Sequence, residues 1–383
     1  MSRKDKYQAT KSSYTTATQA TNVDNSISQA RKETRQSGKI SNNLVDPSSY
    51  HGLRSSRTRF DEHPSGLFRL VKGIPMTLST YVDGSSSFGD ALVKQTFKGL
   101  EKAFEICSKV MPQYELWTLS GLFNDLSDGQ FPLYRSQFEY DPVKIIEQLT
   151  SCIANDGGGN NGGEDSQYAI FAEAYLSQRT IDLYGLKGYA FFISDEPMHD
   201  RFLSADTPKK IFGDKVFETI QANGFPEINE HNIPTVQQAI AQMLRTNHAF
   251  YIGLGSDWTR DNAGRNALQC WSEMLGSDRV IPLYGMSGDV IPYVQGIVCG
   301  LTEGTLSLVD VPIALAENGV AEANISQITR AVANIPMGAQ AELIKQLPHP
   351  LPKADDLFRT KTDLWPVDQS EIPEETPEDP VWV

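Results

Sequence analysis

The fold is decided by the stretch Leu78–Gly89, L-S-T-Y-V-D-G-S-S-S-F-G, in which an apolar, β-branched run ends in an aspartate and three serines. An amphipathic helix is predicted to begin at about Phe88. Asp83, Ser85 and Ser87 are oxygen donors spaced two residues apart on a tight loop after a strand. Because Mg²⁺ and Mn²⁺ prefer oxygen ligands, this loop outlines a metal site. A simpler interpretation is a turn in which the same side chains cap the helix.

The composition indicates a globular protein with a large core. The chain has 383 residues, of which 39% are hydrophobic, and its formal net charge of −14 argues against binding to nucleic acid, which needs clustered Lys and Arg. The sequence contains no run of about 18 apolar residues, so no membrane span is predicted. The amino terminus lacks the apolar core of a secretory signal. We therefore expect a cytoplasmic protein, or one within a particle assembled in the cytoplasm.

The four cysteines are far apart and form no Cys-x-x-Cys pair: Cys107, Cys152, Cys270 and Cys299. Each lies in an apolar or helical context. They are predicted to be small buried hydrophobic residues in a reducing compartment rather than disulfide or metal ligands.

The two ends of the chain carry opposite charges. Residues 1–60 hold eleven Lys/Arg against four Asp/Glu, whereas residues 353–383 hold three against nine. Neither end has enough large apolar side chains to offset the entropy of ordering. We expect a disordered basic arm at 1–60 and a disordered, acidic, Pro-rich tail at 348–383.

Apolar runs alternate with helical patterns between these ends. Strands are predicted at Met76–Val82, Tyr114–Phe123, Lys187–Ser194, His248–Gly255 and Arg279–Leu283, with a short edge strand within Phe131–Phe138. Helices are predicted at Phe88–Met111, Val143–Ile153, Ser166–Tyr184, Gly264–Leu275 and Val290–Thr302. This alternation indicates an α/β fold with a doubly wound, mostly parallel sheet flanked by helices. Ligands of such sheets bind at the carboxyl ends of the strands, where Asp83 and Asp195 are expected to meet.

Two further helical regions complete the predicted domain organisation. The α/β domain spans 68–310 and includes a helical insertion at about 197–247. A C-terminal helical extension follows at 311–347, with a break at Pro336, because proline cannot continue a helix.

The three loops at the sheet edge carry a resemblance that covers Met76–Gly304. The D-x-S-x-S motif, a glycine-rich loop at Asp156–Ser166 and a later strand that ends before Asp195 are similar to a von Willebrand factor type A (vWA) domain with its metal-ion-dependent adhesion site (MIDAS). In that family the serine hydroxyls ligate the ion, and the aspartate holds it directly or through water. Because neither a signal peptide nor disulfides are predicted, the chain resembles the intracellular, bacterial or phage-type branch of the family.

The second and third loops depart from the family pattern. The family has a ligating Thr after Gly-Gly, where this chain has Glu164, Asp165 and Ser166, and it has T-D-G where this chain has S-D-E. Extra carboxylates raise affinity for a hard dication and reduce its attraction for an acidic ligand from a partner. The resemblance implies that Mg²⁺ or Mn²⁺ is held by Asp83, Ser85, Ser87, Asp195, Glu164 and Asp165.

The resemblance implies a non-enzymatic role as a metal-dependent protein–protein interaction module in an intracellular assembly or scaffold. An acidic residue of the partner protein would complete the metal shell, and an oligomer is compatible with this role. Two alternatives stay open: a Mg²⁺-dependent phosphoester hydrolase that uses Asp83 and Asp195, and a structural or virion-associated protein with a degenerate metal site. His199 is the histidine best placed for acid–base chemistry, although a surface loop position is the simpler interpretation.

Overall fold

The structure, a computed structural model, describes residues 60–62, 68–70, 74–85, 95–96, 98–126, 133–136, 138, 163–177, 185–200, 202, 206–255 and 266–346. Several sequence predictions lie outside these residues, namely Ser87, Cys152, the helix Val143–Ile153, the acidic tail and nearly all of the basic arm. A two-stranded antiparallel hairpin, β1 (Phe60–Glu62) with β2 (Phe68–Leu70), precedes the main sheet.

Six strands form the central sheet in the order β5-β4-β3-β6-β7-β8. Their bounds are β3 Ile74–Asp83, β4 Tyr114–Phe123, β5 Leu133–Arg135, β6 Gly188–Ser194, β7 Asn247–Gly253 and β8 Val280–Pro282. All neighbours are parallel except β5, which runs antiparallel to β4. The chain adds strands outward from β3 in one direction and then from β6 in the other. The predicted doubly wound α/β fold is confirmed, and its topological switch point lies between β3 and β6.

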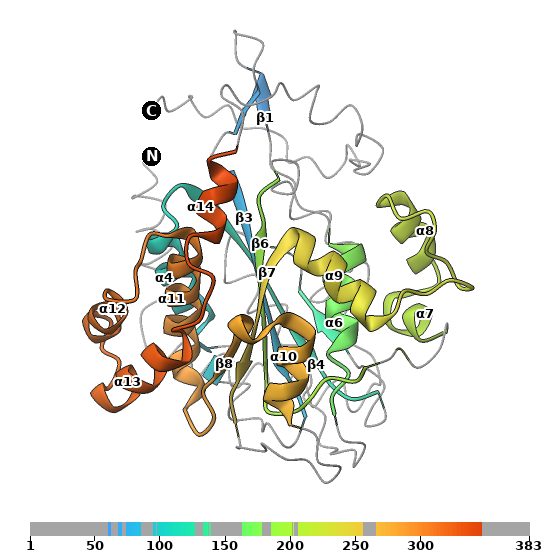
Figure 1. Ribbon diagram of the computed structural model, residues 1–383. Coiled ribbons are helices and arrows are strands. Elements are labelled where there is room, and N and C mark those ends of the chain that lie inside the picture. Colours follow the sequence, from blue (N-terminus) through green and yellow to red (C-terminus); the bar gives the residue numbers. More distant parts are fainter. Residues whose placement is uncertain are drawn as a thin grey trace.

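One face of the sheet is covered by α4 (Leu100–Val110) and α11 (Ile291–Glu303), which pack against each other (Figure 1). Alternate residues of β3, among them Met76, Leu78 and Val82, belong to the core on this side because successive side chains in a strand point to opposite faces. The helices pack closely at Gly296, where an added Cβ would lie 2.2 Å from the Ile106 side chain.

The other face is covered by α6 (Gln167–Phe171), α9 (Val236–Thr246) and α10 (Ala267–Leu275) (Figure 1). Helix α6 continues into a π-helical turn, η2 (Ala172–Leu176). Every residue of β6 and β7 is buried, as the continuous apolar runs predict for strands covered on both faces.

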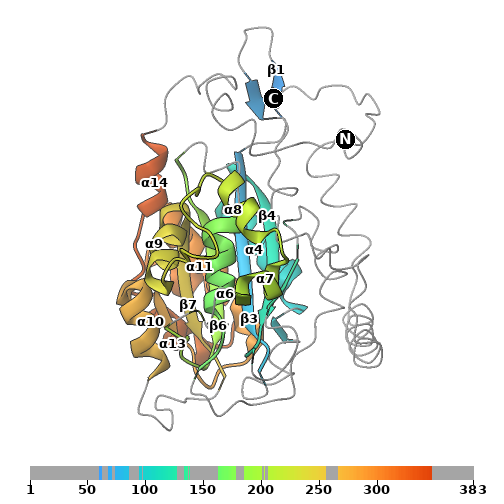
Figure 2. The same cartoon turned by 90° about the vertical axis from the view of Figure 1, so that its right-hand side faces the viewer.

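Three helices lie in the region predicted as an insertion. Helices α7 (Asp206–Phe212) and α8 (Val216–Ala222) form the outermost part of the molecule on this side (Figure 2). Helix α9 instead packs against η2 and β7 and is the crossover helix between β6 and β7. A capping box of Thr235 and Gln238 fixes its start. Only α7 and α8 are therefore additional to the alternating pattern.

The C-terminal extension consists of α12 (Val311–Glu317), α13 (Glu322–Ala331) and α14 (Ala339–Ile344), with the predicted break at Pro336 between the last two. Short 3₁₀ turns, η4 (Ser277–Arg279) and η5 (Gly288–Val290), flank β8. Gln340 joins α14 to the sheet, since its side-chain amide donates to the Lys187 carbonyl over 2.9 Å and its oxygen lies 3.1 Å from His248 Nε2. The extension therefore packs as part of the α/β domain.

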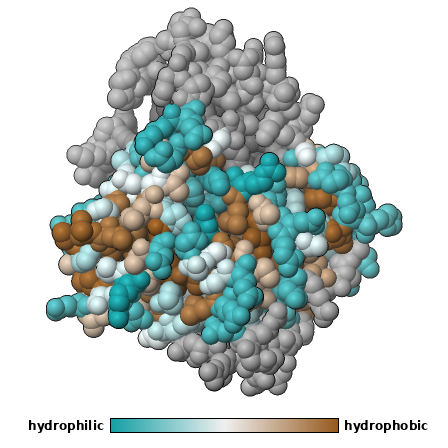
Figure 3. Space-filling model, viewed as in Figure 1, coloured by the Kyte–Doolittle hydropathy of each residue, from teal (hydrophilic) through white to brown (hydrophobic). Residues whose placement is uncertain are grey.

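The surface of the described region carries few large apolar side chains. Val309, Ile313 and Met337 are mostly exposed, and Figure 3 shows apolar surface on the side where α12 lies in Figure 1. Within the described ranges, no helix combines the length and the apolar character needed to cross a membrane. Cys107, Cys270 and Cys299 are buried, and none of them forms a disulfide within the described residues.

Candidate functional site

Two acidic strand ends meet at the carboxyl edge of the sheet. Asp83 is the last residue of β3, and Asp195 directly follows β6. The two strands are parallel neighbours, paired from Leu78↔Tyr189 to Val82↔Ile193, and both carboxylates are fully buried. The structure thus brings Asp83 and Asp195 to the switch point, where doubly wound sheets bind their ligands.

The Asp83 carboxylate accepts hydrogen bonds from the loop that follows it and from the neighbouring strand β6. Its Oδ1 accepts a hydrogen bond from the Ser85 backbone N–H over 2.8 Å, and its Oδ2 accepts one from the Ser194 hydroxyl over 2.6 Å. Burial raises the pKa of Asp83, and the hydrogen bonds from Ser194 and Ser85 oppose that rise. Ser85 is itself buried, and its hydrogen bond to Asp83 keeps the aspartate and the first serine of the D-x-S-x-S motif together.

The loop that carries Asp195 is fixed on its outer side. The Trp271 indole N–H donates to the Glu196 carbonyl over 3.2 Å. Gly255 has φ of +94°, and a Cβ there would lie 3.2 Å from Asp195 Oδ2. Burial raises the pKa of the Tyr251 hydroxyl, Tyr284 raises it further, and the charges of Asp195 and Asp83 add smaller contributions.

The glycine-rich loop is joined to the Asp195 loop through its backbone. The Glu164 N–H donates to the Pro197 carbonyl over 2.9 Å, the His199 N–H donates to the Glu164 carbonyl over 3.3 Å, and Glu164 forms a parallel bridge with Met198. An added Cβ at Gly163 would lie 2.8 Å from the Pro197 oxygen, so glycine permits this close approach. The second and third predicted loops therefore lie side by side.

Asp165 ties the same loop to the turn after β4. Its Oδ2 accepts a hydrogen bond from the Leu126 N–H over 2.7 Å, and its Oδ1 accepts one from the Gln167 side chain. Burial raises the pKa of Asp165. The neighbouring Ser166 hydroxyl is buried and has no hydrogen-bond partner among the described residues.

A further acidic residue at this edge was missed by the sequence predictions. Asp125 follows β4 and is buried, and its Oδ2 lies 3.7 Å from His199 Nε2. The sequence contains the signal, because Asp125 comes two residues after an apolar strand just as Asp83 ends one. His199 lies in a loop, as the simpler interpretation has it, but its side chain is only 18% exposed and faces Asp125.

The donor set at the edge suits a hard cation only if hydroxyl or water ligands take part. Across the described ranges, no group of three or more His, Cys, Asp or Glu side chains is arranged to hold a metal ion. The buried oxygen donors here include Ser85 and Ser166, and the Ser166 hydroxyl has no partner within the described part of the chain. Burial raises the pKa of Asp83 and of Asp165 and so disfavours their charged forms. A bound dication would lower both pKa values again, because it stabilises the carboxylates. These residues fit Mg²⁺ or Mn²⁺, and metal binding stays a prediction.

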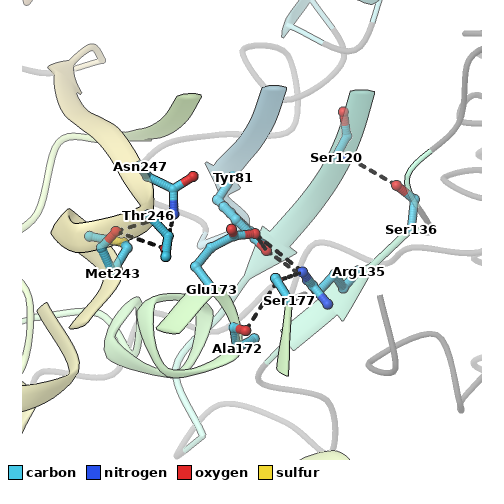
Figure 4. Close-up of polar contacts among 10 residues, drawn as sticks. All are labelled: Tyr81, Ser120, Arg135, Ser136, Ala172, Glu173, Ser177, Met243, Thr246 and Asn247. Carbon is cyan, nitrogen blue, oxygen red and sulfur yellow. Dashed lines mark hydrogen bonds and ion pairs between the residues drawn. The ribbon is translucent and has the colours of Figure 1, made fainter. Parts of the chain in front are cut away.

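A separate buried ion pair lies beside the site and has a structural character. The Arg135 guanidinium on β5 contacts Glu173 Oε1 at 3.2 Å and donates to the Tyr81 hydroxyl over 2.7 Å, and it also contacts Ser177 (Figure 4). Tyr81 in turn donates to Glu173 over 2.7 Å. This network joins β3, β5 and the π-helical turn.

Comparisons with known proteins find similar solved structures at low sequence identity. No protein-family model and no curated protein matches the chain. Among solved structures, the pilus adhesin SpaC from Lactobacillus rhamnosus GG in its open conformation aligns with a TM-score of 0.41 and 11% identity, over 63% of this chain and 33% of the adhesin. The vWF domain of the type V pili tip protein Mfa5 from Porphyromonas gingivalis aligns with a TM-score of 0.37 and 11% identity, over 59% and 94% of the two chains.

Proposed function

We propose that this chain is a non-enzymatic, divalent-metal-dependent protein-binding module that acts within an intracellular assembly. Mg²⁺ or Mn²⁺ would be held at the carboxyl edge of the sheet by Asp83, Ser85, Asp165 and Asp195, with Ser87 and Glu164 as further predicted ligands. The bound ion would supply an open coordination position for an oxygen atom of the partner.

The hydrogen bond from Ser194 to Asp83 carries this proposal. It joins the ends of β3 and β6 across the topological switch point, and so connects two acidic loops predicted from separate parts of the sequence. A capping role alone would not require Asp83 to be bonded to the neighbouring strand. Such an arrangement favours a binding site over a simple turn.

The charge at the edge indicates the chemistry of the partner. Asp125, Glu164 and Asp165 are buried within the loops next to Asp83 and Asp195. A dication surrounded by several carboxylates attracts a further acidic ligand weakly. We therefore favour a partner that offers a neutral oxygen or a carboxylate flanked by basic residues. The three described cysteines are buried without a disulfide, which is compatible with a reducing compartment.

A pull-down with the full chain as bait tests the proposed function. Partner capture should depend on Mg²⁺, should be lost in EDTA and in Asp83→Ala, and should persist in Ser79→Ala. That control removes a buried β3 hydroxyl that has no hydrogen-bond partner among the described residues. Capture that is unchanged by EDTA would contradict the proposal. Turnover of a generic phosphatase substrate that is lost in Asp83→Asn would favour the hydrolase instead.

A further inference from the structure

Ser194 occupies a position between the two acidic loops that the sequence motifs do not single out. It is the last residue of β6, is 1% exposed, and lies directly before Asp195. Its hydroxyl donates to Asp83 Oδ2 over 2.6 Å. One side chain therefore links the carboxylate that ends β3 to the loop that follows β6.

The direction of this hydrogen bond is fixed by the surrounding backbone. The Glu196 N–H donates to the Ser194 hydroxyl oxygen over 2.9 Å, so that oxygen already acts as an acceptor on one side. The hydroxyl proton could go to Asp83 at 2.6 Å or to the Glu196 carbonyl at 3.5 Å. The shorter contact to a carboxylate is the stronger one. The proton of Ser194 therefore lies toward Asp83.

The backbone of Ser194 is also held in place. Its carbonyl accepts hydrogen bonds from the Tyr251 hydroxyl over 2.8 Å and from the Leu254 N–H over 3.0 Å. The Tyr251 hydroxyl lies 3.2 Å from that of Tyr284. The donor that faces Asp83 is thus supported from β7 and from the residues after β8.

The hydrogen-bond donors leave part of the Asp83 carboxylate available. Its two oxygens can together accept about four hydrogen bonds. Oδ1 accepts one from the Ser85 backbone N–H, Oδ2 accepts one from the Ser194 hydroxyl, and the Ser85 side chain also hydrogen-bonds to the carboxylate. The remaining acceptor position can face an ion or its water. Residues that orient a metal ligand in this way typically change metal affinity by about 10-fold to 100-fold when they are mutated.

We propose that Ser194 is a positioning residue whose hydroxyl fixes the Asp83 carboxylate in the orientation that binds the metal. This inference rests on the proposed metal-binding function. Ser194 would not touch the ion itself, and its effect would come through Asp83.

The test is a calorimetric titration of the full chain with Mn²⁺ alone, for wild type, Ser194→Ala, Ser194→Thr and Ser79→Ala. We expect Ser194→Ala to weaken the affinity by about 10-fold to 100-fold, Ser194→Thr to restore most of it because the hydroxyl is kept, and Ser79→Ala to bind like wild type. Urea unfolding in EDTA shows whether each variant keeps its fold. If Ser194→Ala does not fold, Ser194→Cys keeps the volume with a weak donor and should bind weakly.

The outcomes separate the two proposals. Wild-type affinity in Ser194→Ala or Ser194→Cys, together with loss of binding in Asp83→Ala, would overturn the role of Ser194 and leave the metal site standing. An absence of Mn²⁺ binding in the wild type would overturn both.

Discussion

The backbone of Glu164 pairs with that of Met198 in a parallel bridge, which joins the glycine-rich loop to the loop that carries Asp195. Asp165 extends the connection to the turn after β4 through its hydrogen bond with the Leu126 N–H. Loops from three separate parts of the chain are therefore bonded to one another at one edge. A substitution that displaces one loop should therefore displace the other loops as well.

The approach of Gly255 to Asp195 gives the first prediction. Gly255→Ala would place a methyl group 3.2 Å from the Asp195 carboxylate at φ of +94°. We expect this substitution to destabilise the fold and to weaken Mn²⁺ binding. Gly224→Ala is the matched control, because Gly224 has φ of +96° and open space around it. The control should lose only about 1–2 kcal/mol of stability, and equal Mn²⁺ affinities in the two variants would contradict a role for the Asp195 loop.

The buried ion pair predicts a large stability effect that is independent of metal. Glu173→Ala would leave the Arg135 guanidinium without its buried carboxylate partner, at a cost of about 3–5 kcal/mol in the free energy of unfolding. Urea unfolding in EDTA measures this cost. The exposed pair of Lys345 and Glu342 provides the comparison, since Glu342→Ala should change stability little. Similar losses in both variants would show that the Arg135 network contributes no more than a surface pair.

Glu303 predicts a specific dependence of stability on pH. Burial raises the pKa of Glu303 to about 7, even though Tyr189 and Gln113 donate hydrogen bonds to its carboxylate. A carboxyl group whose pKa is raised by folding stabilises the protein below its unfolded pKa of about 4.3. That contribution is lost as the pH rises through about 7.

Glu303→Gln isolates this contribution. Burial lowers the pKa of His248 to about 3, so His248 destabilises the fold as the pH falls below about 6.5 and partly masks the effect of Glu303. We expect the stability of Glu303→Gln relative to wild type to rise by about 3 kcal/mol between pH 4.5 and pH 7.5. A difference that is constant over this range, measured by urea unfolding, would contradict the assignment.

Much of the fold follows from the sequence because the strands are covered on both faces. Tyr114–Phe123 is an uninterrupted run with few polar residues between turn signals, and the structure gives β4 the same bounds. The acid at the end of β3 and the acid after β6 then had to share an edge, since parallel strands end on the same side. The sequence could not show that α9 packs against the sheet, because its position depends on long-range packing.

The site was predicted less completely than the fold. Asp83, Ser85, Glu164, Asp165 and Asp195 are all placed at or beside the carboxyl edge, whereas Ser87 lies outside the described residues. Asp125 and Ser194 were not predicted as site residues, because their importance comes from contacts between segments that are distant in sequence. A serine within a strand carries no local signal of the carboxylate that it faces.

The central claim is tested most directly by calorimetric titration of Mn²⁺ into the full wild-type chain and into Asp83→Ala, with Ser79→Ala as the control. We predict saturable binding in the wild type and in Ser79→Ala, and loss of that binding in Asp83→Ala. An absence of binding in the wild type, or unchanged binding in Asp83→Ala, would contradict a metal site at this edge of the sheet.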